Sequence, residues 1–98
     1  MTITQERNAE KLTLKIEGRI DTKTAPKLEQ TLHEVLDGVK KLVFDLAETA
    51  YISSAGLRVL LIAQKQMNKQ GEMSVIHANS DLMEIFEVTG FTDILTIE

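Results

Sequence analysis

The sequence predicts an α/β fold, with a mixed, partly parallel β-sheet of about five strands covered by about three to four helices. Two observations predict this class. Segments with the two-residue alternation of strands take turns along the chain with segments that have the spacing of amphipathic helices. The run from Leu42 to Leu46 has the apolar character of a central strand covered on both faces. The 98 residues, 43% of them hydrophobic, correspond to one domain, residues 1–98, with enough apolar side chains for a core.

The first two strands are expected near the N-terminus. The segment KLTLKIEG alternates apolar and polar residues, which predicts a strand with one buried face that ends at Gly18. The shorter run Thr2 to Thr4 is expected to pair with it through a turn near Asn8.

The first helix is expected to start at Thr24, with Pro26 tolerated in its first turn and Gly38 placed to end it. Its helically spaced apolar residues are Ala25, Leu28, Leu32, Val35 and Leu36.

The second half of the chain continues the alternation after the central strand. We expect the longest helix over Gly56 to Gln70, a buried strand over Glu72 to Ala78, a short helix capped by Ser80 and a last edge strand over 94–97. The order is therefore strand, strand, helix, strand, helix, strand, helix, strand.

The composition of the chain excludes several classes of function. The chain has no cysteine, which excludes disulfides and thiolate metal sites and favours a reducing, cytoplasmic setting. No signal-peptide pattern and no apolar run of membrane length occur, so we expect no export and no membrane insertion. The net charge of -4 argues against direct binding of DNA or RNA.

Two adjacent serines, Ser53 and Ser54, stand where the central strand gives way to the longest helix. Such junctions are where open α/β sheets usually place their sites. One hydroxyl is explained as a helix N-cap, because serine is among the preferred capping residues. Since the side chains of Ala55 and Gly56 are too small to cover it, the second hydroxyl is expected to be accessible to another protein.

A helical wheel with Ser54 as its origin separates two sides of the longest helix. The side expected to be buried carries Gly56, Val59, Leu60, Ala63 and Met67. On the side of Ser54, Arg58 lies one turn on and Leu61 interrupts the polar residues, which predicts a docking patch with an apolar anchor and a charged rim. Leu57 and Ile62 flank this side, and at least one of them is expected to pack at the edge of the core.

Catalysis is not expected. A serine hydrolase needs a base and an orienting acid, and the only histidines, His33 and His77, fall on a predicted helix and a predicted strand away from the serines. The segment SSAG lacks the leading glycine of a G-x-S-x-G elbow, and no nucleotide-binding G-x-x-x-x-G-K-[ST] loop occurs. The scattered carboxylates have no metal-ligand spacing, so we expect neither metal nor cofactor.

The segments FDLAETAYISSAGLRVLL and EGRID together resemble the STAS domain of bacterial anti-sigma factor antagonists, over essentially the whole chain. The resemblance implies a STAS-like fold and a binding protein that captures an anti-sigma factor, itself a serine kinase using ATP, and so frees a sigma factor. It also suggests a serine phosphatase that acts on the phosphorylated form.

In that family the serine of the motif D-S-[ST]-G-L is phosphorylated. Matching the motif's glycine and leucine to Gly56 and Leu57 puts Ser54 at the phosphorylated position. Ser53 takes the place of the aspartate and is the alternative acceptor. The resemblance implies that Asp21 of the segment GRID contacts the kinase. The alternative is that Asp21 serves as a helix cap or turn residue. With the docking patch, the expected partner-binding residues are Asp21, Thr22, Ser53, Ser54, Gly56, Leu57, Arg58 and Leu61.

Other roles of STAS-like domains stay open. Such domains also resemble regulatory subunits of membrane lipid ABC transporters and scaffolding components of stress-signalling complexes, in which the serines would serve as capping or contact groups. The identity of the sigma factor, the upstream signal and the oligomeric state, monomer or weak dimer, are not predicted.

Overall fold

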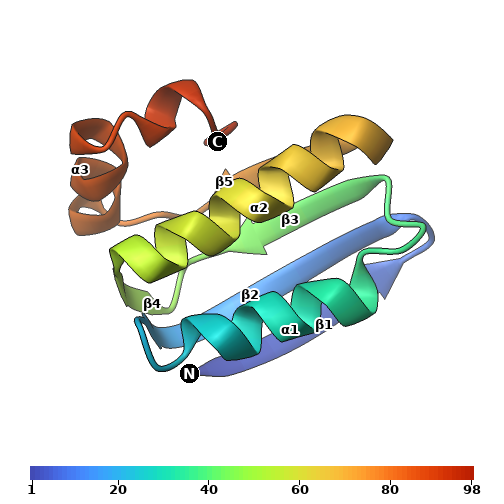
Figure 1. Cartoon of the computed structure of the whole chain (residues 1–98), viewed down its shortest axis with the longest axis horizontal. Coiled ribbons are helices and arrows are strands. Elements are labelled where there is room, and N and C mark those ends of the chain that lie inside the picture. Colours follow the sequence, from blue (N-terminus) through green and yellow to red (C-terminus); the bar gives the residue numbers. More distant parts are fainter.

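The computed structural model describes residues 1–98, in which the strands of one five-stranded sheet alternate with helices (Figure 1). The strands are β1 (Thr2–Asn8), β2 (Lys11–Ile20), β3 (Lys41–Asp45), β4 (Thr49–Ile52) and β5 (Glu72–Ile76). The helices are α1 (Ala25–Val35), α2 (Ser54–Gln70), α3 (Ser80–Val88) and the short 3₁₀ helix η1 (Phe91–Asp93). The strand order is β1-β2-β3-β5, and β4 pairs with β2 beside this path. Because only β1 and β2 are antiparallel, the predicted mixed, partly parallel sheet is confirmed.

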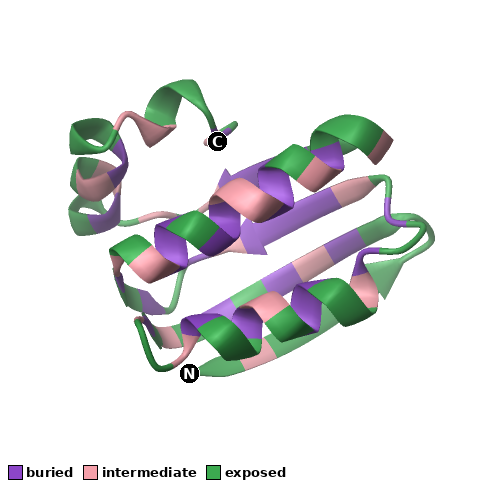
Figure 2. Ribbon diagram, viewed as in Figure 1, coloured by how far each residue is buried: buried purple, intermediate pink, exposed green.

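Helices α1 and α2 lie side by side across one face of the sheet, and α3 lies beyond α2 (Figure 1). The alternation in β2 decides which face they cover, because Leu12, Leu14 and Ile16 are buried whereas Thr13 and Lys15 between them are half-buried and exposed, respectively. Figure 2 shows the buried residues on the inner sides of the helices and on the sheet beneath them. A cluster of 23 buried apolar residues fills the space between the layers. The core therefore supports α2 along its length.

The N-terminal hairpin is longer than predicted. Strand β1 extends to Asn8, with Ala9 in the left-handed region of the turn at φ 55°. Gly18 does not end β2, which continues to Ile20. At Gly18, φ is +102° and the register of β2 against β4 shifts between Gly18 and Arg19. Glycine thus allows a change of partner strand inside β2 instead of terminating it.

Strand β4 is an element that the sequence analysis does not predict, because it places no strand between Leu46 and the longest helix. It pairs in parallel with the last three residues of β2, after β3 has paired with the first part of the same strand. Strand β2 therefore links β3, at the centre of the sheet, to β4, which leads into the start of α2.

The C-terminal region also differs from the expectation. Residues 94–97 do not form an edge strand, and only Ile97 makes a bridge to Val75. The cap of α3 is Asn79, whose side chain accepts a hydrogen bond from the backbone N–H of Leu82 at 2.9 Å, and not Ser80. Strand β5 ends at Ile76, two residues earlier than predicted.

Candidate functional site

The two serines lie at one end of the molecule, where β2 and β4 end and α2 begins (Figure 1). The backbone N–H of Ser53 donates to the carbonyl of Ile20 at 2.8 Å, and the N–H of Leu57 donates to the carbonyl of Ser53 at 2.9 Å. These bonds tie the start of α2 both to the sheet and to its own first turn. The position of the two serines is therefore fixed by backbone hydrogen bonds to β2 and within α2.

The structure divides the two hydroxyls between two roles. Ser53 is the N-cap, in extended conformation (φ -92°, ψ 176°), and its Oγ accepts a hydrogen bond from the N–H of Gly56 at 3.3 Å. Ser54 is the first residue of α2, and it is exposed. Its Oγ makes no hydrogen bond within the chain, in contrast to that of Ser53. Capping thus explains one serine and leaves the hydroxyl of Ser54 open, as predicted.

Gly56 lets α2 approach the sheet closely. A Cβ at this position would lie 2.7 Å from Cγ2 of Ile20, 2.7 Å from Cγ1 of Ile52 and 3.1 Å from the carbonyl oxygen of Ile20. Real Cβ atoms do not come so close to other heavy atoms, so this contact requires glycine. Gly56 is buried, and its role is to seat the helix start on β2 and β4.

The two sides of α2 follow the helical wheel. All five residues of the predicted buried side are buried: Gly56, Val59, Leu60, Ala63 and Met67. Leu57 is only 5% exposed and belongs to the core cluster, which confirms that at least one of Leu57 and Ile62 packs against the core. The expected partner contact of the Leu57 side chain is therefore corrected. Leu61 and Ile62 are half-buried, so Leu61 is less exposed than the docking patch assumed.

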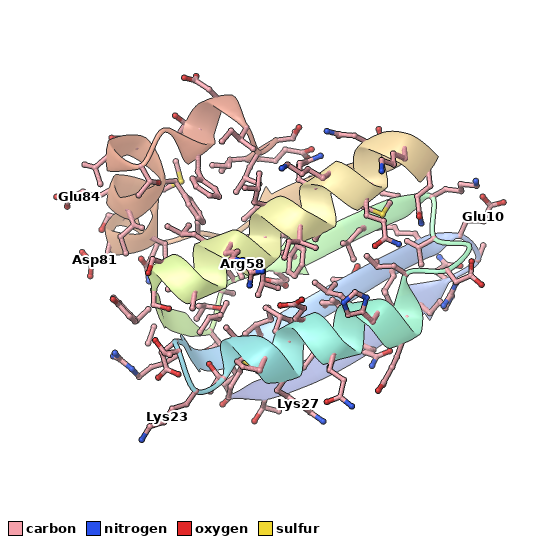
Figure 3. All side chains as sticks on the ribbon, in the orientation of Figure 1. Glu10, Lys23, Lys27, Arg58, Asp81 and Glu84 are labelled. Atoms are coloured by element: carbon pink, nitrogen blue, oxygen red, sulfur yellow. The ribbon has the colours of Figure 1, made fainter.

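Arg58 projects from the outer side of α2 (Figure 3). Its Nη1 lies 3.9 Å from Oε1 of Glu29 on α1, and its side chain is 71% exposed. An ion pair this long and exposed is worth little, because water screens it and two flexible side chains must be ordered. Arg58 is therefore available to a new anion one helical turn from Ser54.

Asp21 organises the loop between β2 and α1. Its Oδ1 accepts hydrogen bonds from the N–H groups of Lys23 and Thr24, both at 3.0 Å, and the Thr24 hydroxyl donates to the carbonyl of Arg19 at 2.8 Å. The hydrogen bond from the Thr24 backbone, above all, lowers the pKa of the Asp21 carboxyl, although partial burial opposes this shift. Asp21 therefore acts as a turn residue, which is one of the two roles that the sequence analysis gives it. The neighbouring Thr22 is exposed.

Arg19 and Tyr51 lie next to the serines and were missed from sequence. They are cross-strand partners in the β2–β4 pair, and Cζ of Arg19 lies 4.4 Å from the centre of the Tyr51 ring. Without β4 there was no reason to bring them together. The strand-forming residues in the segment TAYI were the signal that could have revealed it.

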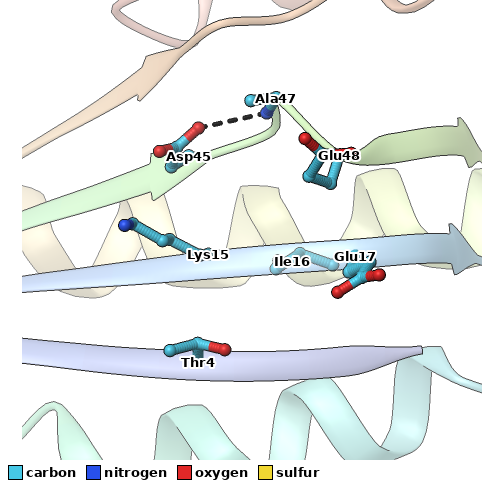
Figure 4. A pocket seen from close by; sticks show the side chains of 7 residues that line it. All are labelled: Thr4, Lys15, Ile16, Glu17, Asp45, Ala47 and Glu48. Carbon is cyan, nitrogen blue, oxygen red and sulfur yellow. Dashed lines mark hydrogen bonds between the residues drawn. The ribbon is translucent and has the colours of Figure 1, made fainter.

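A hollow of about 240 Å³ is lined by residues other than the serines (Figure 4). Its lining residues are Thr4, Lys15, Ile16, Glu17, Asp45, Ala47 and Glu48. Burial alone would raise the pKa of the Asp45 carboxyl, but the hydrogen bonds with Nδ1 of His77, at 2.9 Å, and the N–H of Ala47, at 3.1 Å, lower it overall. The Asp45 carboxylate thereby fixes the loop that leads from β3 into β4.

Comparison with known proteins shows that the chain is similar to bacterial proteins named anti-sigma factor antagonists. Residues 1–98 match the family model described as STAS domain. The anti-sigma-B factor antagonist of Listeria monocytogenes is 34% identical over 97 residues, which cover 96% of this chain and 84% of that protein. BtrV of Bordetella bronchiseptica, provisionally named an anti-sigma factor antagonist, is 37% identical over 84 residues, which cover 84% of this chain and 72% of that protein.

A solved structure agrees with the same grouping. The crystal structure of an anti-sigma factor antagonist from Mycobacterium paratuberculosis is similar with a TM-score of 0.88 at 26% sequence identity, over 98% of this chain and 83% of that one. In the present fold, no helix has both the length and the apolar character needed to cross a bilayer.

Proposed function

The chain belongs to the STAS-domain family, and from this premise we propose that it is a cytoplasmic anti-sigma factor antagonist. It binds an anti-sigma factor that is itself a serine kinase, and the sigma factor held by that kinase is released. Phosphorylation of Ser54 switches the binding off, and a serine phosphatase restores it. The chain acts as a binding protein and not as an enzyme.

The observation that carries this proposal is that the two serines have different structural roles. The Oγ of Ser53 caps α2 by accepting a hydrogen bond, whereas Ser54 is exposed and its hydroxyl makes no hydrogen bond within the chain. A hydroxyl with no structural task can be modified without loss of a bond that the fold needs. Ser54 is therefore the acceptor, and Ser53 is disfavoured because its Oγ already accepts from Gly56.

The fold can accommodate a phosphate on Ser54. The group adds a charge of about -1.5 to -2 at neutral pH, and at the first residue of a helix it meets free N–H groups and the positive end of the helix dipole. Arg58 lies one turn on, held only by its long contact with Glu29. No rearrangement of the core is required.

The partner cannot accommodate the phosphate as easily. An interface that closes over a neutral hydroxyl would have to desolvate the dianion or place it against like charge. A penalty of about 3 to 4 kcal/mol corresponds to a loss of several hundred-fold in affinity. The phosphate would thus act directly on the docking surface.

The experiment combines phosphorylation and binding. The purified chain is incubated with a candidate anti-sigma kinase and ATP, and the peptide spanning Ser53 and Ser54 is analysed by mass spectrometry. We expect one phosphate, which Ser54→Ala abolishes and the matched control Ser53→Ala retains. In calorimetry Ser54→Ala should bind the kinase as tightly as the unphosphorylated protein, and Ser54→Asp several hundred-fold more weakly.

Two results would contradict the proposal. Equal affinity of wild type and Ser54→Asp would remove the switch. Binding to an ABC-transporter subunit or to a stress-signalling scaffold, without modification of either serine, would favour the other roles of STAS-like domains.

A further inference from the structure

Arg19 and Tyr51 form a cation–π pair between the ends of two neighbouring strands. The Arg19 guanidinium lies over the Tyr51 ring, 4.4 Å from its centre, and the two residues are cross-strand partners at the ends of β2 and β4. The Arg19 side chain is 61% exposed, and Tyr51 is one of the few large apolar residues that are exposed, at 37%. The pair is therefore held in place but remains accessible.

The guanidinium has unused hydrogen-bonding capacity. Its contact with Asp21, from Nε to Oδ2, is 3.7 Å long, which is too long for a hydrogen bond. The side chain of Arg19 makes no other ion pair, and all five of its N–H donors lack an acceptor within the chain. Contact with an aromatic ring restricts a guanidinium, so less freedom is lost when a carboxylate binds its fork of donors.

The pair lies beside Ser54 but faces away from α2. Ile20 packs under Gly56 at the start of α2, and alternation along β2 turns the neighbouring Arg19 to the opposite side. Arg19 is consequently not placed to bind a phosphate on Ser54, a position that Arg58 on α2 occupies.

The distance from Ser54 is short compared with the size of an interface. Tyr51 precedes Ser54 by three residues, so their Cα atoms are at most about 11 Å apart. A standard interface covers about 800 Å² of each partner, a disc about 16 Å in radius. A protein that closes over Ser54 and around this end of the sheet thus also reaches Tyr51 and its strand neighbour Arg19.

We propose that Arg19 and Tyr51 form an anchor in the docking surface, which selects a kinase partner that presents an aspartate or glutamate side chain to the Arg19 guanidinium. The inference rests on the proposed function and names the chemistry of the partner at a second point of the same surface. Arginine and tyrosine are among the residue types that are enriched at the positions which dominate binding energy at interfaces. A carboxylate is the group whose geometry matches the free guanidinium fork.

The test measures the affinity of variants for the anti-sigma kinase that phosphorylates Ser54. Arg19→Glu should weaken binding about 30-fold or more, because it places two carboxylates against each other. Tyr51→Ala should weaken it about tenfold, and Arg19→Lys should fall between wild type and Arg19→Glu, since lysine keeps the charge but loses the fork. The matched control is Arg7→Glu on exposed β1, at the other end of the sheet, which should stay within about twofold because such distant charges are screened.

Charge exchange identifies the partner group. Each exposed carboxylate on the docking face of the kinase is replaced by lysine in turn, and one replacement should restore the binding of Arg19→Glu to within about tenfold of wild type. Thermal melting of each variant verifies folding, and Arg19→Lys serves as the conservative substitute if Arg19→Glu is unstable.

The outcomes separate this inference from the proposed function. If Ser54→Asp binds weakly while Arg19→Glu matches Arg7→Glu, the anchor is refuted and the switch stands. If Arg19→Glu binds weakly but no lysine replacement restores it, the carboxylate partner is refuted. If Ser54→Asp binds as wild type does, the proposed switch fails, whatever the Arg19 variants show.

Discussion

Gly56→Ala tests the claim that α2 starts in direct contact with the ends of β2 and β4. The added methyl group would meet Cγ2 of Ile20 and Cγ1 of Ile52 at 2.7 Å and the carbonyl oxygen of Ile20 at 3.1 Å. Isoleucine is stiff at χ1 and the carbonyl belongs to the backbone, so neither neighbour can move away cheaply. The helix start must therefore lift from the sheet.

Two opposing terms set the magnitude. Overpacking a well-filled site costs about 1 to 3 kcal/mol, and three close contacts put Gly56→Ala toward the upper end of this range. Alanine in place of a helical glycine contributes at most about 1 kcal/mol in the other direction. We therefore expect a net loss of about 2 kcal/mol, which for a chain of this length lowers Tm by about 8 to 16 °C.

The assay is urea unfolding followed by circular dichroism. A fall in the midpoint with an unchanged slope would show that stability is lost without a change in the two end states. The control is Gly38→Ala, where the added Cβ meets nothing within 4 Å but φ is +80°, so only backbone strain contributes. A Gly56→Ala variant as stable as wild type, or more stable, would refute the close approach of α2.

The remaining two predictions concern the N-cap and the half-buried carboxylate of Asp45. Ser53→Ala should destabilise the fold by about 1 kcal/mol through loss of the cap, whereas Ser54→Ala should change stability by less than about 0.5 kcal/mol, and equal urea midpoints would contradict the division of roles. For Asp45 the folded-state pKa is lowered, so its stabilisation is present above the unfolded pKa near 3.9 and is lost as pH falls through the folded value. Asp45→Asn should thus be less stable than wild type at pH 7, with the gap closing toward pH 3, and a gap independent of pH would refute this linkage.

The failure to predict β4 has a physical cause. Its four residues show no two-residue alternation, since Thr49 and Ile52 are buried while Ala50 and Tyr51 between them are exposed. The register shift beside Gly18 explains this pattern, because one extra residue of β4 lies opposite β2 at that point. A sequence pattern cannot reveal a bulge without knowledge of the partner strand.

The longer elements were predictable because each carries a regular pattern. Strand β2 and the buried side of α2 follow periods of two and 3.6 residues over many positions. The serine pair could be assigned to one cap and one open hydroxyl, but assigning Ser53 to the cap required its extended backbone conformation. The sequence predicts that at least one of Leu57 and Ile62 packs at the edge of the core, but which of them is buried depends on the elements packed beside α2, which the wheel of a single helix does not include.

Strand β2 changes partners along its length, from β3 at Lys11–Lys15 to β4 at Gly18–Ile20. Any insertion or deletion in this strand after Lys15 would therefore move the end of the molecule that carries Ser53 and Ser54 relative to an unchanged core. Under the proposed function, exchanging partner preference between homologous chains requires residues 18–24 and 49–58 to be transferred together, because these two segments, distant in sequence, lie side by side at that end.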